Sequence, residues 1–472
     1  MQPQRPFDPV ITFKNSQGET ARGTLTSVQR RSLVMEIYNP HSIVQVSEVL
    51  QDLTVRAGEK PVYTGKGVVV SLLNTGLMAV ASVTLIDEWK ELNAFASNAD
   101  EAGEEALRFV QDWEDRFKIR QSYQVVVSEL RTFLSETSRW IDQADLVETL
   151  PKELTGQLRD DVFWAIAAPL MRKGKEYLDR LEVEAAALTP EESLPHRMYA
   201  QTALHPLILR APFVYRTFAK PLGYAGDYEM VNQILGNPRQ GETTYIQVVN
   251  ATFLRAAVAQ AHRNRIGFLI EFLEQAIAQG AAEGRKIRIL NVGCGPAGEI
   301  QQLIASDRDL GNLHFTLLDF SDVTLNYTRE KLQSLQAEHG RELTVDFIQE
   351  SVHNLLKKPA REKAASSDVP PYDFVYCAGL FDYLSDKVCS RLIRYFMAAS
   401  RPGGKMLLTN VHKDNPERHG MEHLLEWHLI YRNEEDMEGL VGGLGMRPRL
   451  WTDPTGVNVF SESSVPTGES SV

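Results

Sequence analysis

The residues with the clearest chemical meaning in this chain form a glycine-rich turn. An apolar run at 287–292 leads into Gly293, Gly295 and Gly298, spaced G-x-G-x-x-G, where a helix is expected to begin. Glycines here let the backbone turn tightly and bring main-chain N–H groups close to a bound nucleotide. The spacing alone is weak evidence, because glycine turns also simply join strands to helices.

An acidic residue strengthens the nucleotide interpretation. A second apolar run, from His314, ends at Asp319, about 20 positions after the glycines, where the hydroxyls of an adenosine ribose need a carboxylate. The alternative is a helix cap, but Ser321 and Asp322 can serve as caps and leave Asp319 free for the ribose. Phe320, the next residue, could pack on the adenine ring.

The elements after these two strands decide between a dinucleotide dehydrogenase and an S-adenosylmethionine (SAM) methyltransferase. The turn Arg401-Pro-Gly-Gly404 precedes an apolar strand, and the chain closes with a helix and a hairpin. This order resembles the class I SAM-dependent methyltransferases, in which a Pro-Gly-Gly turn commonly precedes the fifth strand. The second mononucleotide-binding half expected of a dehydrogenase is missing. The expected elements are strands at 343–351, 372–379 and 405–411, helices at 386–400 and 434–442, and a hairpin of 447–451 with 457–460.

The resemblance, which covers about 285–460, implies SAM as the cofactor and suggests which residues hold it. Asn291 stands where many members have Asp or Glu, so it can bond the glycine loop but brings no negative charge to the cofactor's ammonium group. Adenine is expected near Ser351 and Val352, and Ala378 lies at the carboxyl edge of the sheet. Arg265, on the preceding helix, could meet the methionine carboxylate; a surface salt bridge is the alternative.

The methyl acceptor is constrained by mechanism. Methyl transfer from a sulfonium is an in-line displacement, so the protein mainly aligns the reacting atoms and excludes water. A carboxylate acceptor needs no base, whereas a phenol, alcohol or amine would benefit from one, and His412 is the best-placed candidate. Tyr383 could orient the acceptor and Phe381 could line an acyl or aromatic pocket; simple packing is the alternative for both.

The middle of the chain, 93–284, is predicted to be helical and contains an unusual aromatic segment at 213–231. Aromatic, glycine-hinged segments beside a cofactor domain are candidate lids, and Tyr224, Asp227 and Tyr228 are its polar candidates. A domain-packing hinge is the alternative.

Three stretches narrow the resemblance: 221–228, 263–266 and 379–384. Together they look like a bacterial methyltransferase group that includes the 3-hydroxypalmitic acid methyl ester synthases, which methylate the carboxylate of a hydroxy fatty acid. This implies a (3-hydroxy) fatty-acid carboxylate as the acceptor. The alternatives are O- or N-methylation of another metabolite, or a regulatory protein that senses SAM without turning it over.

The first 92 residues have a different texture, with six short β-rich stretches separated by turns, which predict a small barrel. The pattern resembles a PilZ-type domain, a family that includes cyclic-di-GMP receptors. The paired-arginine signature of that family is missing, and Arg30 and Arg31 are expected in a solvated turn. The resemblance therefore implies a fold and no ligand.

Composition limits the remaining possibilities. The net charge of -12 disfavours broad contact with nucleic acid, no run is apolar and long enough to span a bilayer, and no signal peptide is evident. Three cysteines form neither a disulfide framework nor a zinc pattern, so no metal is expected. We predict a cytoplasmic α/β protein acting on a small molecule. Its expected parts are a barrel at 1–92, a helical cap at 93–284, a Rossmann-like methyltransferase domain at 285–460 and a disordered tail at 461–472.

Overall fold

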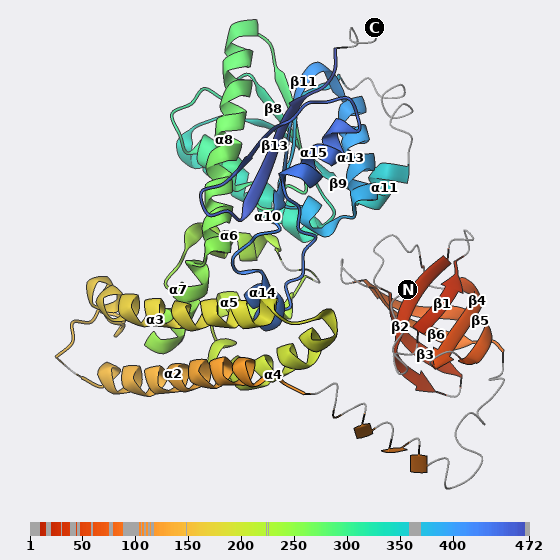
Figure 1. The fold of residues 1–472 in the computed structure, drawn as a ribbon. Helices are drawn as coiled ribbons and strands as arrows, with labels where there is room; N and C mark the ends of the chain where they lie inside the picture. The colour runs from red at the N-terminus through yellow and green to blue at the C-terminus, as the bar shows by residue number, and fades with distance from the viewer. Residues whose placement is uncertain are drawn as a thin grey trace. The chain divides into compact units, whose positions relative to one another are not determined.

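The protein is described from a computed structural model, which divides the chain into two compact units. The first contains 1–118 with 220–224, and the second contains 119–219 with 225–472 (Figure 1). The described residues are 10–15, 20–29, 31–37, 44, 48–57, 60–74, 79–87, scattered positions in 103–117, 118–147, 149–222, 224, 226–357 and 370–467. The two units are treated separately below.

The first unit contains a closed six-stranded barrel, as predicted, with strand order β1-β2-β3-β6-β5-β4 and antiparallel neighbours. Side chains alternate between the two faces of each strand, so every second residue points into the barrel. Along β3, Leu33, Met35 and Ile37 are buried in the barrel's own core. Arg31 lies exposed in a turn, and Arg30 falls outside the described residues. The strands are β1 (Val10–Lys14), β2 (Thr20–Gln29), β3 (Ser32–Ile37), β4 (Val49–Ala57), β5 (Lys60–Asn74) and β6 (Ala79–Leu85).

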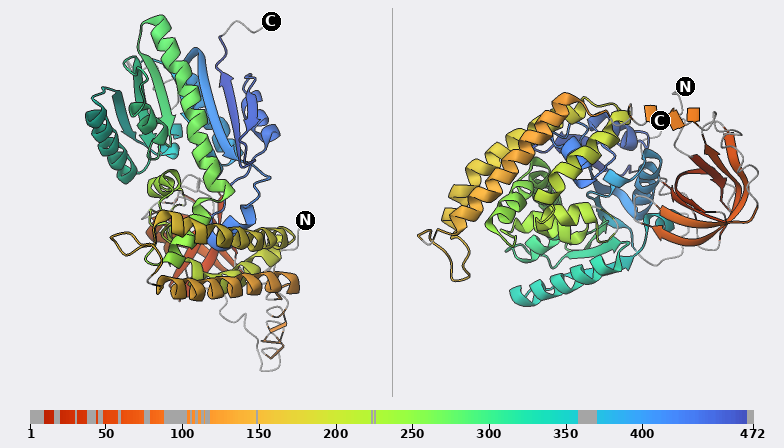
Figure 2. Two further views of the ribbon diagram at one scale, coloured as in Figure 1. Left: turned by 90° about the vertical axis from the view of Figure 1, so that its left-hand side faces the viewer. Right: turned by 90° about the horizontal axis from the view of Figure 1, so that it is seen from below.

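The second unit begins with a helical region that has an apolar core of its own. Tyr123, Phe163 and Leu204 are completely buried there, because the long amphipathic helices α2 and α3 turn their apolar faces inward and α4 packs against α2. The helices are α2 (Gln121–Asp145), α3 (Asp160–Ala186), α4 (Pro190–Ile208), α5 (Pro212–Ala219), α6 (Tyr228–Gly236), α7 (Thr244–Leu254) and α8 (Ala257–Glu283). Figure 2 shows α8 running from this region along the sheet.

The sheet of the second unit has seven strands in the order β12-β13-β11-β10-β7-β8-β9. Five neighbouring strands are parallel, and β13 is antiparallel to both β11 and β12, which is the predicted Rossmann-like methyltransferase arrangement. The strands are β7 (Ile287–Val292), β8 (Leu313–Asp319), β9 (Thr344–Gln349), β10 (Tyr372–Cys377), β11 (Ser400–Val411), β12 (Arg449–Thr452) and β13 (Asn458–Ser464).

Helices cover both faces of this sheet. One face packs against α8, α9 (Gly298–Ile304) and α10 (Asp322–His339), and the other against α11 (Val352–Lys357), α13 (Asp386–Ala399) and α15 (Glu434–Gly442). The parallel strands are therefore buried on both sides and read as near-continuous apolar runs. None of the helices in the described part of the chain is long and apolar enough to cross a membrane.

The prediction of a disordered tail from residue 461 placed its start too early. Strand β13 continues to Ser464, and the side chains of Ser461 and Ser463 are buried against the sheet. Ser461 lies opposite Leu408 and Ser463 opposite Met406 in the antiparallel ladder with β11. The serines concealed this strand because small polar side chains in an antiparallel pair do not produce an apolar pattern.

Residues 412–432 form an insertion between β11 and α15, here called the β11–α15 insertion, which joins the sheet to the helical region. Its helix α14 (Arg418–Leu425) packs against α3, α4 and α5. The Glu417 carboxylate accepts hydrogen bonds from the first two N–H groups of α8, at Ala257 and Val258, each 2.9 Å long. Helical region and sheet consequently form one unit.

Candidate active site

The glycine turn between β7 and α9 has the geometry predicted for it. Gly293 and Gly295 have φ angles of 73° and 51°, which L-residues with a Cβ rarely adopt. At Gly298 a Cβ would come within 2.6 Å of the Leu235 Cδ1 atom on α6, so a side chain there would require the Leu235 side chain to move. The space beside Gly295, in contrast, is open. The backbone of this turn is therefore open to close approach by a ligand.

Asp319 supports this loop from the end of β8. Its Oδ2 accepts a hydrogen bond from Gly295 N and its Oδ1 one from Ser321 N, both 3.1 Å long. Burial raises the pKa of Asp319, and these backbone donors oppose that rise. Ser321 caps α10 by accepting from Thr324 N, so Asp319 is not needed as the helix cap. Each carboxylate oxygen keeps a lone pair for a further donor, as a ribose role requires.

Glu299 is a functional candidate that the sequence analysis missed. Its Oε1 accepts hydrogen bonds from the Tyr376 hydroxyl at 2.7 Å and from Asn291 Nδ2 at 3.2 Å. No described residue donates a hydrogen bond to the Oε2 atom of Glu299. Burial raises the pKa of this carboxyl. Glu299 thus places an acidic group beside Asn291, where many methyltransferases carry Asp or Glu. Its position directly after Gly298 was the signal that could have revealed it.

Arg265 is buried on α8 without a partner. It makes no hydrogen bond or ion pair with any residue in the described part of the chain, and its Nη1 atom is fully enclosed. Burial lowers the pKa of the guanidinium, opposed mainly by the negative charge of Asp382. A Cβ on Gly379 would lie 3.2 Å from Nη1, so Arg265 lies against the turn after β10.

The surface salt bridge considered for Arg265 is therefore wrong. Its neighbour Arg263 is the anchored one, because its Nη1 donates to the carbonyl oxygens of Ile234 and Leu254. A buried guanidinium without an anion costs several kcal/mol. Such a cation, among residues at the carboxyl edge of a parallel sheet, is a candidate anion-binding group.

The residues predicted as the polar members of the lid segment differ in their contacts from what was expected. Asp227 is almost fully buried, where it caps α6 by accepting from Met230 N at 2.8 Å and pairs with Arg216 at 2.8 Å. It is therefore a structural residue rather than a substrate contact. The Tyr228 ring packs 4.5 Å from the Tyr327 ring of α10. Tyr224 belongs to the first unit, so the structure does not place it at the site.

Tyr383 lies on the acceptor side of the site. Its hydroxyl accepts a hydrogen bond of 3.1 Å from the Trp427 indole, which comes from the β11–α15 insertion. A Cβ at Gly226 would lie 2.8 Å from the Tyr383 hydroxyl oxygen, so Gly226 lies directly against this group. The Trp427 ring in turn lies 6.1 Å from the His262 ring of α8. The sequence analysis missed both Trp427 and His262.

Two predicted acceptor-side residues are corrected by their contacts. His412 Nδ1 accepts from Asp414 N at 3.0 Å, so Nε2 carries the proton and donates to Glu434 Oε2 at 2.9 Å. With its lone pair occupied, His412 has no free site for a substrate proton. Phe381 is completely buried in the core that β10 shares with α13, so it does not line a pocket.

The remaining predicted cofactor residues lie at the carboxyl ends of the strands. Ser351 caps α11 by accepting from Asn354 N at 3.2 Å, and Val352 packs partly against the neighbouring core. The Phe320 side chain is 48% exposed beside Asp319, and Ala378 is partly buried at the end of β10. The adenine position inferred from these residues stays a prediction.

Arg432 holds the residues around Tyr383 in place through buried hydrogen bonds. This fully buried side chain donates to the Phe381 and Leu384 carbonyl oxygens, to Asn410 Oδ1 and to Asp386 Oδ1. It therefore locks the loop after β10 to the end of β11. In the described residues no group of three His, Cys, Asp or Glu side chains could hold a metal ion.

With this geometry in view, the comparisons with known proteins are informative. Residues 289–404 match the model of a methyltransferase domain. This part of the chain is a SAM-dependent methyltransferase domain. Its cofactor is SAM, and the cradle fits it: the turn is open beside Gly295, and a buried cation and a buried carboxyl are available for the amino-acid end of SAM.

The solved structures similar to the chain are distant. A possible exported protein from Bordetella parapertussis has 14% identity and a TM-score of 0.40, covering 67% of this chain and 100% of that one. Magnesium protoporphyrin IX methyltransferase from Synechocystis, with bound S-adenosylhomocysteine (SAH), has 13% identity and a TM-score of 0.36, with coverages of 53% and 97%. N-methyltransferase NodS from Bradyrhizobium japonicum, also with SAH, has 11% identity and a TM-score of 0.32, with coverages of 51% and 98%. The search of curated proteins gave no match.

Proposed function

We propose that the protein transfers the methyl group of SAM to a small-molecule acceptor bound between the lid segment and the carboxyl edge of the sheet. The observation that carries this proposal is the buried, unpaired Arg265 beside Gly379. In our assignment Arg265 binds the carboxylate of the methionine moiety and Glu299 its ammonium group, while Asp319 receives the ribose hydroxyls. Opposite charges placed this way read both ends of a zwitterion.

The acceptor that we propose to test first is the carboxylate of a 3-hydroxy fatty acid. It rests on the resemblance carried by 221–228, 263–266 and 379–384. In support, residues of all three segments come together: Gly226 lies against Tyr383, and Arg265 lies against Gly379. Segments far apart in sequence that meet over the cofactor edge are what a shared substrate site needs.

In this proposal the chain's residues position the reaction rather than drive proton transfer. SAM, when bound, supplies an electrophilic methyl group, and a carboxylate attacks it without a base. Tyr383, held by the Trp427 indole, would orient the acceptor. The lid segment over Tyr383 would exclude water, which also keeps the reacting atoms aligned.

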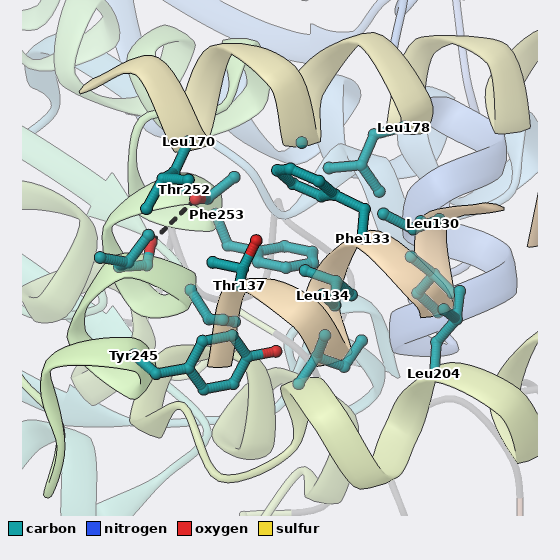
Figure 3. Close-up of a pocket in the computed structure, with 15 residues that line it drawn as sticks. Leu130, Phe133, Leu134, Thr137, Leu170, Leu178, Leu204, Tyr245, Thr252 and Phe253 are labelled. Atoms are coloured by element: carbon teal, nitrogen blue, oxygen red, sulfur yellow. Dashed lines mark hydrogen bonds between the residues drawn. The ribbon is translucent and has the colours of Figure 1, made fainter. Parts of the chain in front are cut away.

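The cavity inside the helical region does not accommodate an acyl chain. It lies between α2, α3, α4 and α7, and it is lined almost entirely by apolar side chains, including Leu130, Phe133 and Leu204 (Figure 3). Its volume of about 40 Å³ has room for about three water-sized groups. An acyl chain would therefore have to lie along the lid side of Tyr383, or the helices would have to separate.

For the barrel we propose a PilZ-like fold with no assigned ligand, and the closure of six antiparallel strands supports this fold. For the whole protein we propose a cytoplasmic location.

The test of the proposed function is isothermal titration with SAM and SAH, followed by methyl-transfer assays. The intact protein is expected to bind both in the micromolar range, and Asp319→Ala to lose at least tenfold in affinity, because the ribose loses its carboxylate. The matched control is Asp322→Ala, an exposed side chain three residues away. Binding without transfer to any acid, phenol or amine would favour a SAM-sensing regulator, and absence of binding would overturn the proposal.

A further inference from the structure

His262 carries a lone pair that nothing in the described part of the chain uses. It lies on α8, about one turn before Arg265, and only 6% of its surface is exposed. Its Nδ1 bonds the Val258 carbonyl oxygen at 2.8 Å. A carbonyl oxygen only accepts, so the ring proton is on Nδ1 and the lone pair is on Nε2. Nε2 has no hydrogen-bond partner among the described residues and is not fully enclosed.

This imidazole stays neutral. Burial, with help from the charge of Arg265, lowers the pKa of His262 to about 3. A general base works best when its pKa lies near the working pH, so His262 is poorly suited to remove a substrate proton. A neutral imidazole nitrogen is nevertheless a full hydrogen-bond acceptor, and leaving it unsatisfied on substrate binding would cost free energy.

The neighbours of His262 connect it to Tyr383. The ring of Trp427 lies 6.1 Å away, and its indole N–H bonds Tyr383, the residue proposed to orient the acceptor. A carboxylate would be repelled by the lone pair on Nε2, whereas a hydroxyl would be attracted to it. Of the two polar groups of a hydroxy acid, only the hydroxyl therefore suits this position.

We propose that His262 Nε2 accepts a hydrogen bond from an uncharged hydroxyl of the methyl acceptor, which makes His262 a specificity-determining residue for hydroxylated substrates. The inference rests on the proposed function, which places the acceptor beside Tyr383. It deepens that function by requiring a hydroxyl in addition to the methylated group.

A matched pair of acceptors tests this proposal: 3-hydroxydecanoic acid and decanoic acid, which differ only in the hydroxyl. Methyl ester formation would be followed by mass spectrometry in the intact protein, in His262→Phe and in His314→Phe. Binding of each acid in the presence of SAH would be measured in parallel, as would SAM affinity. His314, which pairs with Asp346 at the amino end of the sheet, is the control.

The expected result is a preference of roughly tenfold in kcat/KM for the hydroxy acid in the intact protein and in His314→Phe, and nearly equal kcat/KM for the two acids in His262→Phe. A variant that loses both acids equally, or keeps the preference, would overturn the proposal. If neither acid is methylated but the hydroxy acid binds better in a His262-dependent way, the inference holds and the proposed reaction fails. If neither acid binds, both fail.

Discussion

At the scale of single residues, the site is defined by charges buried before any ligand is present. Arg265 and Glu299 are both almost fully buried and do not bond each other. Removing charged groups from water costs several kcal/mol each unless they are paired. The folded protein carries this cost in the free state, and a zwitterionic ligand that pairs both groups would relieve it. Such preorganisation converts a stability cost into binding affinity.

The first prediction follows from this cost. Arg265→Met should lower SAM affinity by roughly tenfold to a hundredfold, because a charge-assisted hydrogen bond contributes about 1.5–3 kcal/mol. The same variant should be more stable than the parent without ligand, since an uncompensated buried charge is replaced by an apolar side chain of similar length. Isothermal titration and the midpoint of thermal unfolding measure the two effects.

The control for this prediction is Arg139→Met, which removes an exposed arginine on α2 that pairs with Glu136. It should leave both quantities nearly unchanged, because exposed ion pairs contribute little. Unchanged SAM affinity in Arg265→Met would show that the guanidinium binds something other than the cofactor.

Some of these residues could be predicted from sequence and some could not. The glycines and Asp319 are recognisable because the cofactor turn depends on local spacing. Trp427 could not be predicted in this way. It bonds Tyr383 although it lies 44 residues later in the sequence, and no local sequence pattern indicates the path of the β11–α15 insertion that carries it. His412 also misled, because its position after β11 suggested a base, whereas the Asp414 N–H occupies its lone pair and its other ring nitrogen donates to Glu434.

At the scale of elements, the β11–α15 insertion is held by carboxylates at helix starts. Glu417 caps α8, and Glu182 of α3 accepts hydrogen bonds from His419 N at 2.8 Å and Gly420 N at 2.7 Å in the first turn of α14. Unsatisfied N–H groups at a helix start attract negative charge. These bonds hold the β11–α15 insertion, which contains Trp427, to α8 and to α3.

The second prediction concerns the pH dependence of this fastening. Burial raises the pKa of Glu182 to about 7 from an ordinary value of 4.5, with the backbone N–H groups opposing the rise. Between these two values the unfolded chain has lost the proton and the folded protein keeps it, so stability falls as pH rises. The full shift would correspond to roughly 3 kcal/mol, and partial exposure reduces this to about 1–2 kcal/mol.

Urea denaturation at pH 5.0, 6.0 and 7.5 tests the effect. Relative to the parent, Glu182→Gln, which cannot titrate, should gain about 1–2 kcal/mol of stability between pH 5.0 and pH 7.5. The exposed Glu176 of α3 offers the matched control, Glu176→Gln, which should follow the parent. Parallel pH profiles for the parent and Glu182→Gln would show that another group titrates instead.

Element boundaries were predictable where apolar runs end at glycine or proline, and less so elsewhere. The parallel strands were recognisable because burial on both faces requires continuous apolar sequence. The last residues of β13 were missed because Ser461 and Ser463 are polar although buried. The packing of α14 against α3 and α4 depends on tertiary contacts that no single segment encodes.

At the scale of the whole molecule, the chain contains two units with separate apolar cores. The barrel core includes Ile11, Met35 and Tyr63, all buried within the strands of the first unit. The cores of the helical region and the sheet belong to the second unit. The first unit extends to residue 118, beyond the predicted boundary at 92, and the helical cap is not separate from the methyltransferase sheet.

Separate cores lead to the third prediction, which concerns cooperativity. Differential scanning calorimetry of the full chain should resolve two transitions, because each unit buries its own apolar surface. SAM at about 100 times its Kd should stabilise the second unit by about 2.7 kcal/mol and raise its transition by several degrees, while the barrel transition stays in place. Arg265→Met, with its affinity lowered tenfold to a hundredfold, should remove about half or more of this stabilisation at the same SAM concentration. A single transition, or a barrel transition that also moves with SAM, would instead mean that the barrel is energetically coupled to the cofactor site.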